Sequence, residues 1–295
     1  FVPSGALATM KTLANTDYAH KFINDGSVVV AEVYFGGAWR TVLVGTQGRG
    51  GKSVYALDIT NPDSFAANKV LWEYTHTSLG QTTGTPVITR LNDGNWAVVV
   101  GNGYNSTNAR AELFVLNISN GALLARIDTL RGSSGTPNGL AAVEGVDVDR
   151  DGDTDYFYGG DLLGNLWKFD LSNAAPAQWR IAYGTTAAPD PLFTARSASN
   201  VVQPITGGVS VGFNPADRKL WVFFGTGRYL STGDFFQSYL AGVEAQAKDR
   251  SADLAFAEGR GMSVAEIIPF DRELVCGAPQ CARSLDDVAG KMAAT

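Results

Sequence analysis

A short hydrophobic strand that ends in glycine recurs four times along this 295-residue chain, at residues 42–45, 98–101, 156–159 and 222–225. Successive copies begin about 56, 58 and 66 residues apart, and self-similarity at a period of this size is typical of repeat architectures. A second strand with its own recurring lettering follows the first three copies, at 54–59, 113–118 and 166–171. This repetition constrains the fold more than any other feature of the sequence.

Each repeat is predicted to hold four strands. One strand precedes each glycine-ended strand, and another follows the second strand of the first three repeats, at 70–74, 122–127 and 178–183. The second strand ends in an Asx residue whose side chain is expected to accept hydrogen bonds from the following backbone and so close the turn: Asp58, Asn117 and Asp170. Four strands per unit predict an all-β fold, a modified or partial β-propeller of four-stranded antiparallel blades. A sandwich or a barrel would not repeat the same lettering.

The blades are expected at about 27–75, 82–129, 139–184 and 201–232, within a propeller region of residues 1–233. So few blades rarely close a ring, so either the chain is part of a larger propeller or its ends supply closing strands. Residues 234–295 are predicted to form a short helical or irregular tail, because the strand pattern stops there. The two cysteines, Cys276 and Cys281, lie in this tail, and both a local disulfide and two unpaired thiols are open.

Charge and hydropathy exclude two classes of partner. The net charge is -6 with a pI near 5.0, and no run of Lys and Arg is present, so nucleic acid is not expected to bind. No apolar stretch approaches the roughly 20 residues that a membrane-spanning helix requires. The chain starts at Phe1 without a basic or apolar export segment, and any signal peptide is expected upstream in a longer precursor.

One loop carries a pattern of metal ligands. Residues 147–155 place five carboxylates at strictly alternate positions, Asp147, Asp149, Asp151, Asp153 and Asp155, with Gly152 between the third and the fourth. In an EF-hand loop, side chains at positions 1, 3 and 5 and the carbonyl of position 7 converge on one ion, while a glycine at position 6 permits the sharp turn. The loop fits these positions. It is not an EF-hand, because position 12 is a tyrosine and a strand follows.

The ion predicted for this loop is Ca²⁺. Asp155 at position 9 can complete an oxygen shell of the kind that Ca²⁺ prefers over the smaller Mg²⁺. Without a cation the loop would gather five negative charges against the single Arg150, and like charges about 4 Å apart repel by roughly 1 kcal/mol even in water. The alternative is a solvated acidic turn, which Asp and Gly also favour.

Several segments make the chain similar to the PilC/PilY group of type IV pilus biogenesis factors and tip adhesins. Among them are Val-Leu-Trp-Glu at 70–73, Gly-Asn-Gly-Tyr-Asn-Ser at 101–106 and Gly-Asp-Leu-Leu-Gly-Asn-Leu-Trp-Lys-Phe-Asp-Leu at 160–171. The resemblance covers about residues 1–232 and implies a modified propeller with an EF-like calcium loop. It maps calcium ligands onto Asp147, Asp149, Asp151, Asp153 (through its carbonyl) and Asp155.

The same resemblance implies a function. In that group, calcium occupancy regulates pilus extension against retraction, and with it twitching motility and adhesion. The implied partners are pilins or minor pilins, a host or abiotic surface, and an upstream adhesin domain of the same precursor. The implied location is the bacterial cell surface, at the pilus tip or outer membrane. The chain contains no Arg-Gly-Asp sequence, so integrin binding by that motif is not supported.

Three other functions are compatible with a calcium-binding propeller. Quinoprotein dehydrogenases are calcium-containing propellers, but they collect metal ligands from separate blades, whereas the carboxylates here lie in one loop. Integrin-like propellers repeat the acidic loop in several blades, and here a single repeat carries it. A calcium-stabilised scaffold or interaction propeller of the cell envelope stays open as the alternative. No enzymatic activity is expected.

Overall fold

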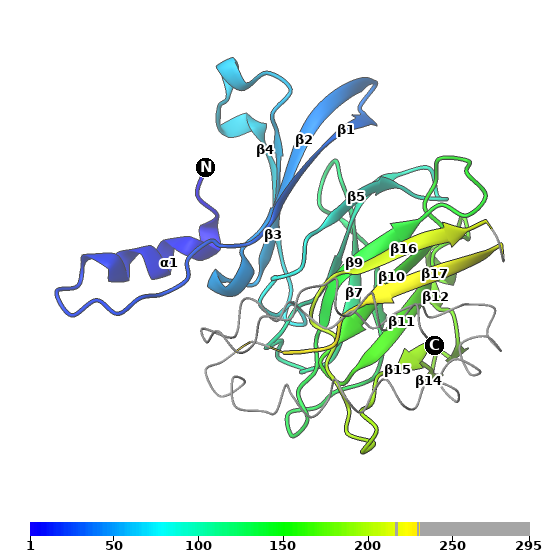
Figure 1. Ribbon diagram of the computed structural model, residues 1–295. Helices are drawn as coiled ribbons and strands as arrows, with labels where there is room; N and C mark the ends of the chain where they lie inside the picture. Colours follow the sequence, from blue (N-terminus) through cyan, green and yellow to red (C-terminus); the bar gives the residue numbers. More distant parts are fainter. Residues whose placement is uncertain (216–217, 229, 231–295) are drawn as a thin grey trace, which may run out of the picture.

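The computed structural model describes residues 1–215, 218–228 and 230. Within this part of the chain, antiparallel sheets form the body of the molecule, and the longest helical elements have four residues (Figure 1). The predicted all-β fold of four-stranded antiparallel sheets is therefore confirmed. No helix of the described part is long and apolar enough to cross a membrane.

The first three repeats each form a sheet in which consecutive strands pair. The first sheet contains β1 (Val28–Phe35), β2 (Ala38–Thr46), β3 (Ser53–Asp58) and β4 (Val70–Thr75). The second contains β5 (Val87–Arg90), β6 (Trp96–Gly101), β7 (Glu112–Asn117) and β8 (Leu123–Asp128). The third contains β9 (Leu140–Val146), β10 (Tyr156–Asp161), β11 (Asn165–Asp170) and β12 (Arg180–Ile181), with β15 (Phe193–Thr194) as a fifth strand.

The remaining described elements form two-stranded sheets and short helical turns. The described part of the fourth repeat pairs β16 (Val209–Asn214) with β17 (Lys219–Phe224), and β13 (Gly184–Thr185) pairs with β14 (Ala188–Pro189). At the N-terminus, α1 (Leu7–Met10) lies between the 3₁₀ turns η1 (Ser4–Ala6) and η2 (Lys11–Ala14). Four more 3₁₀ turns lie in connections: η3 (Gly48–Gly50), η4 (Pro62–Ser64), η5 (Ala67–Lys69) and η6 (Pro176–Gln178).

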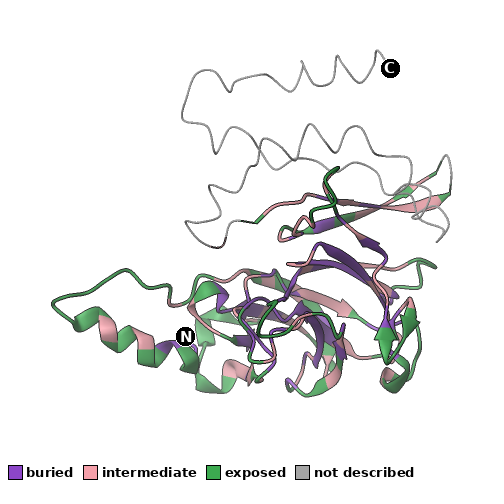
Figure 2. Ribbon diagram, turned by 90° about the horizontal axis from the view of Figure 1, so that it is seen from below, coloured by how far each residue is buried: buried purple, intermediate pink, exposed green. Residues whose placement is uncertain are grey.

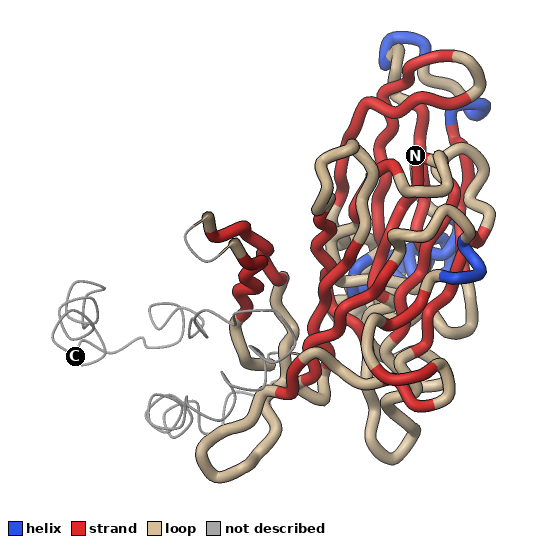
Figure 3. The backbone as a smooth tube through the Cα atoms, turned by 90° about the vertical axis from the view of Figure 1, so that its right-hand side faces the viewer, coloured by secondary structure: helices blue, strands red, loops and turns tan. Residues whose placement is uncertain are grey.

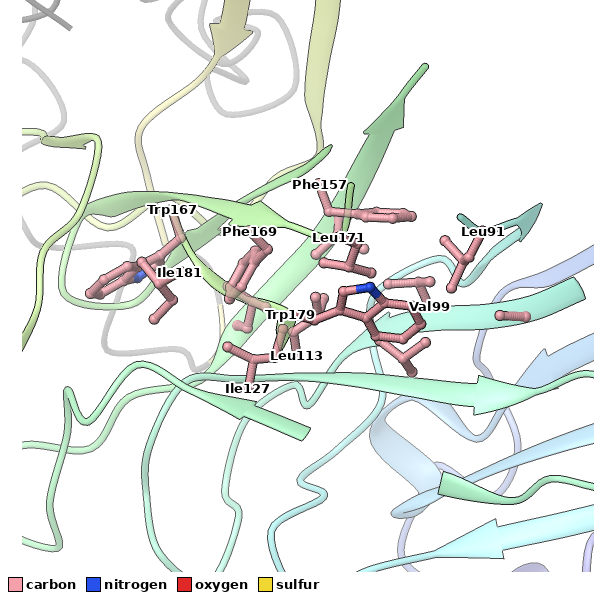
Figure 4. Close-up of a cluster of buried hydrophobic side chains, with 14 of the residues drawn as sticks. Leu91, Val99, Leu113, Ile127, Phe157, Trp167, Phe169, Leu171, Trp179 and Ile181 are labelled. Atoms are coloured by element: carbon pink, nitrogen blue, oxygen red, sulfur yellow. The ribbon is translucent and has the colours of Figure 1, made fainter. Parts of the chain in front are cut away.

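The sheets stack face to face because both faces of their central strands are apolar. In β6, Val98 and Val100 pack toward the first sheet, while Ala97 and Val99 pack toward the third. Side chains point to opposite faces at successive strand positions, so one run of hydrophobic residues serves two interfaces. Figure 2 shows the buried residues concentrated between the sheets, and Figure 4 shows the cluster between the second and third sheets, which includes Phe157, Trp167 and Trp179.

The first strands of the sheets lie side by side along the inside of the molecule, β1 next to β5, β5 next to β9, and β9 next to β16. They line an open cavity of about 450 Å³ whose walls are mostly apolar, and Glu144 is the one charged residue that the described part of the chain places in its lining. First strands around an axis, with later strands of each sheet farther out, form the blade arrangement of a propeller. Figure 3 shows strands of the body of the molecule running side by side.

The expected turn closures are confirmed in all three repeats. Asp58 Oδ1 accepts the backbone N–H of Thr60 at 3.0 Å and its hydroxyl at 2.6 Å. Asn117 Oδ1 accepts the backbone N–H of Ser119 at 2.9 Å and its hydroxyl at 2.7 Å. Asp170 Oδ1 accepts the same two groups of Ser172 at 3.1 and 2.6 Å. A carboxylate or amide oxygen thus fixes the turn that follows the third strand of each of these sheets, β3, β7 and β11.

One expectation differs from the structure. The strand predicted over 178–183 pairs only over β12, because η6 precedes it and β15 pairs with the other end of the same edge of β11. Trp39 lies beside the tight turn of the β1–β2 hairpin and is 61% exposed, with its ring centroid 6.2 Å from that of Trp96 in the second sheet. The predicted tail 234–295, with Cys276 and Cys281, lies outside the described residues.

Candidate metal centre

The acidic loop, residues 147–155, joins β9 to β10 in the third sheet. Its base is closed by the antiparallel pairing of Val146 with Tyr156 and by the Asp155 N–H, which donates to Val146 O at 3.0 Å. The N–H of Leu171 donates to Asp155 O at 2.8 Å, which fastens the loop's second end to the segment after β11. The strands therefore hold both ends of the loop and leave its tip to be shaped by local interactions.

Three of the predicted ligands converge at the tip. Carboxylate oxygens of Asp147, Asp149 and Asp151 all lie within 4.8 Å of one another. Two backbone positions make this possible, because Arg150 has φ +66° and Gly152 has φ +95°, and such positive values turn the chain back on itself. Asp147 is half-buried, while Asp149 and Asp151 are exposed, so the cluster opens to solvent on one side.

Backbone N–H groups hold the carboxylates in place. Asp147 accepts from the N–H of Arg150 at 2.6 Å through one oxygen and from that of Gly152 at 2.9 Å through the other. Asp149 accepts from the N–H of Asp151 at 3.2 Å, and Asp151 accepts from that of Asp153 at 2.8 Å. An ionised carboxylate has about four lone-pair sites, so each retains acceptor capacity for a cation after these bonds form.

The carboxylates of Asp153 and Asp155 lie outside this cluster, at the buried base of the loop. Asp153 Oδ1 lies 3.2 Å from Arg90 Nη1, an ion pair without hydrogen-bond geometry. Asp155 accepts from the N–H of Val148 at 2.8 Å and from the side-chain amide of Asn92 at 3.2 Å. With the Asp153 carboxylate directed at Arg90, its backbone carbonyl is the group left for an ion, and ligation by Asp153 and Asp155 stays a prediction.

Two carboxyl groups of the loop, those of Asp149 and Asp153, have raised pKa values. The Asp151 N–H lowers the pKa of Asp149, but desolvation and repulsion from the other loop carboxylates outweigh it, so the pKa is raised overall. For Asp153, burial is the largest cause of a raised pKa, opposed by Arg90 and reinforced by its acidic neighbours. A divalent cation among hard oxygen donors relieves this repulsion, so the residues present fit a calcium ion.

Two residues of this region were not identified from the sequence. Arg90 ends β5 and Asn92 lies in the β5–β6 turn, 63 residues before Asp155. Neither belongs to a motif. The sequence signal that could place them beside the loop is positional, because repeats in register bring the turns between first and second strands to the same end of the molecule.

The fold and the site define a class of protein. It is a partial β-propeller of four-stranded blades, and an acidic loop with alternating aspartates joins the first two strands of its third blade. The chain belongs to the PilY1 β-propeller family, because the family model described as "PilY1 beta-propeller domain" matches residues 4–252. The resemblance to the PilC/PilY group is thereby confirmed.

Known relatives agree with this assignment. A type IV pilus biogenesis factor PilY1 homologue of Xylella fastidiosa is 43% identical over 246 residues, which cover 79% of this chain and 17% of the relative. PilY1 of Pseudomonas aeruginosa strain PAO1 is 38% identical, covering 79% of this chain and 21% of that protein. The chain thus spans about a fifth of the length of these relatives.

A solved structure matches the fold as well. The crystal structure of the Pseudomonas aeruginosa PilY1 C-terminal domain superimposes with a TM-score of 0.68 at 38% sequence identity. The match covers 80% of this chain and 49% of that one. The sheets described above therefore correspond to about half of the domain in the solved relative.

Proposed function

We propose that this chain is the calcium-binding propeller of a type IV pilus biogenesis factor, and that calcium occupancy regulates pilus extension against retraction. Twitching motility and surface adhesion would change with it. The single observation that carries the calcium part of the proposal is the convergence of the Asp147, Asp149 and Asp151 carboxylates. The pilus part is supported by relatives that are named as type IV pilus biogenesis factors.

The proposed ion acts through charge and geometry. Carboxylates of Asp147, Asp149 and Asp151, the carbonyl of Asp153 and the carboxylate of Asp155 would supply its oxygen ligands. Calcium supplies two positive charges that cancel repulsion within the loop. At high calcium the loop then adopts a single ordered conformation. At low calcium the repulsion between its carboxylates is no longer cancelled, and that conformation loses its stabilisation. A loop that orders with calcium concentration is a switch.

The proposed partners and location extend what the relatives' names support, which is a role in type IV pilus biogenesis. Pilins or minor pilins would contact the propeller, and the protein would act at the bacterial cell surface, at the pilus tip or outer membrane, together with an upstream adhesin domain. A host or abiotic surface is the proposed adhesion target. The proposal assigns no enzymatic activity, in line with relatives that are named as biogenesis factors.

The function is tested in the bacterium that encodes the chain. The chromosomal copy is replaced by the full-length gene carrying Asp147→Ala, and surface pili and twitching are measured with calcium present and after chelation. We expect the variant to behave at high calcium as the unaltered strain behaves after chelation. The matched control is Asp63→Ala, which removes an exposed aspartate of η4 in the first blade.

A second measurement separates regulation from scaffolding. Pilins are captured by the purified full-length protein with and without calcium. Capture that changes with calcium, and no longer changes in Asp147→Ala, supports the regulatory proposal. Piliation and capture that are identical in both proteins at every calcium concentration would identify the chain as an envelope scaffold and refute regulation by calcium.

A further inference from the structure

The acidic loop is fastened to the neighbouring blade as well as to its own. The Thr154 N–H donates to Arg90 O at 2.9 Å, and the hydroxyls of Thr154 and Thr89 lie 2.6 Å apart. Leu91 forms a parallel β-bridge with Thr154. Thr154 lies between two aspartates of the loop, yet its backbone and its hydroxyl both bond to the second sheet.

The aspartates that flank Thr154 also contact the second blade. Arg90 Nη1 lies 3.2 Å from Asp153 Oδ1, and the side-chain amide of Asn92 donates to Asp155 Oδ1 at 3.2 Å. Thr89, Arg90, Leu91 and Asn92 are four consecutive residues, running from the end of β5 into the β5–β6 turn. The C-terminal third of the loop is thus held by one continuous segment of the second blade.

We infer that the acidic loop is a calcium-controlled clasp between the second and third blades, in which Thr89 and Asn92 are positioning residues for the ion. This inference rests on the proposed calcium site. Neither residue is a ligand in it. Asn92 fixes the carboxylate of Asp155, and Thr89 fixes Thr154, which lies between the two ligands at the base of the loop.

The coupling follows from the direction of these bonds. An ion that draws the carbonyl of Asp153 and the carboxylate of Asp155 inward restrains Thr154 between them, and restraint on Thr154 is transmitted to Arg90 and Thr89. Coupling between two sites is reciprocal, so contacts that stabilise the clasp must also favour the ion. Groups that orient metal-binding carboxylates typically change metal affinity by roughly 10- to 100-fold when they are removed.

The hydrophobic interface beneath the clasp is the part of the structure on which the coupling would act. Leu91 belongs to the buried cluster that also contains Leu140, Val143 and Phe157 of the third blade. The residue that bridges to Thr154 is therefore also a core residue of the interface between the two blades. Ordering of the loop by calcium would add to the packing at that edge of the interface.

The first test measures calcium affinity by titration calorimetry on the purified chain. Asn92→Ala and Thr89→Val leave the net charge unchanged, so a change in affinity cannot arise from bulk electrostatics. We expect Asn92→Ala to bind calcium roughly 10-fold more weakly, and Thr89→Val to bind several-fold more weakly. The control is Asn61→Ala, which removes an exposed asparagine beside η4, and its affinity should equal that of the unaltered chain.

The second test follows hydrogen exchange by mass spectrometry in a peptide covering residues 87–95, which contains no proposed calcium ligand. We expect calcium to slow exchange there severalfold in the unaltered chain and to have no effect in Asp147→Ala. Thr89→Val keeps the size and shape of the side chain, so it retains the fold if Asn92→Ala does not.

The outcomes separate the inference from the function on which it rests. Calcium binding with unchanged affinity in both positioning variants, or calcium protection confined to residues 147–155, overturns the clasp and leaves the calcium site intact. Failure of the unaltered chain to bind calcium overturns both.

Discussion

The indole nitrogen of Trp72 in β4 donates to the backbone carbonyl oxygen of Ile118 at 2.8 Å, and this bond joins the outer strand of the first blade to the β7–β8 turn of the second. Trp72 is 8% exposed and Ile118 is 1% exposed, so neither group can exchange its partner for bulk water. Gly121, at φ +70°, makes room for the ring, since a Cβ there would lie 2.8 Å from ring atoms. The bond adds a buried polar contact to the apolar cluster that joins these two blades.

Trp72→Phe should destabilise the chain by about 2 kcal/mol, because it leaves the buried carbonyl of Ile118 without a donor and removes part of the ring. The measurement is the midpoint of urea unfolding followed by circular dichroism. Trp39→Phe is the control, and its effect should be below about 0.5 kcal/mol because that ring is mostly in solvent. Equal midpoints for the two variants would show that the inter-blade bond contributes nothing.

Acid unfolding should depend on Asp58. Burial raises the pKa of this carboxyl, but hydrogen bonds from Thr60 and Arg40 and the charge of Lys69 outweigh it, and the pKa is lowered from 3.8 to about 2. A lowered pKa stabilises the folded state above the unfolded value, and this stability is lost as the pH falls from about 4 to about 2. The shift corresponds to at most about 2 kcal/mol.

Asp58→Asn should therefore flatten the loss of stability between about pH 4 and pH 2, while lowering stability at neutral pH. Urea unfolding midpoints at a series of pH values measure both effects. The exposed Asp63 supplies the control, and Asp63→Asn should keep the acid dependence of the unaltered chain. A stability profile of Asp58→Asn that remains parallel to the original across that window would contradict the assignment.

Gly152 should be required for the shape of the metal loop. Its φ is +95°, and no atom lies within 4 Å of a Cβ built there, so Gly152→Ala introduces backbone strain without a clash. A strain of about 1 kcal/mol would weaken calcium binding by roughly 5-fold. Calorimetry on this variant is compared with Gly37→Ala, which imposes a similar strain at φ +80° in the β1–β2 hairpin. We expect Gly37→Ala to leave calcium affinity unchanged, and equal affinity in both would show that the loop does not need the glycine.

Much of the fold could be predicted because the repeats carry their own local signals. Glycine-ended strands and the closing Asp58, Asn117 and Asp170 depend on residues only a few positions apart, so the sequence indicates the sheets directly. The shared edge of β11 could not be predicted, because β15 reaches it from outside the recognised repeat. The exposure of Trp39 likewise depends on the place of its hairpin at the end of the first sheet.

The candidate metal site likewise has one part that could be predicted from the sequence and one part that could not. Alternating aspartates and a glycine predicted the convergence of Asp147, Asp149 and Asp151, since local turns alone produce it. The roles of Arg90 and Asn92 could not be predicted, because their contacts with the loop exist only once two blades have stacked. The direction of the Asp153 carboxylate, away from the tip and toward Arg90, has the same tertiary origin.

The central claim is that the loop between β9 and β10 binds one calcium ion through Asp147, Asp149 and Asp151. Calorimetric titration of calcium into the purified chain and into Asp147→Ala tests it most directly, with Asp63→Ala as the matched control and circular dichroism to establish that all three are folded. We predict one ion per chain for the unaltered protein and for the control, and loss of binding in Asp147→Ala. Equal calcium affinity in all three proteins, or no binding to any of them, would contradict the claim.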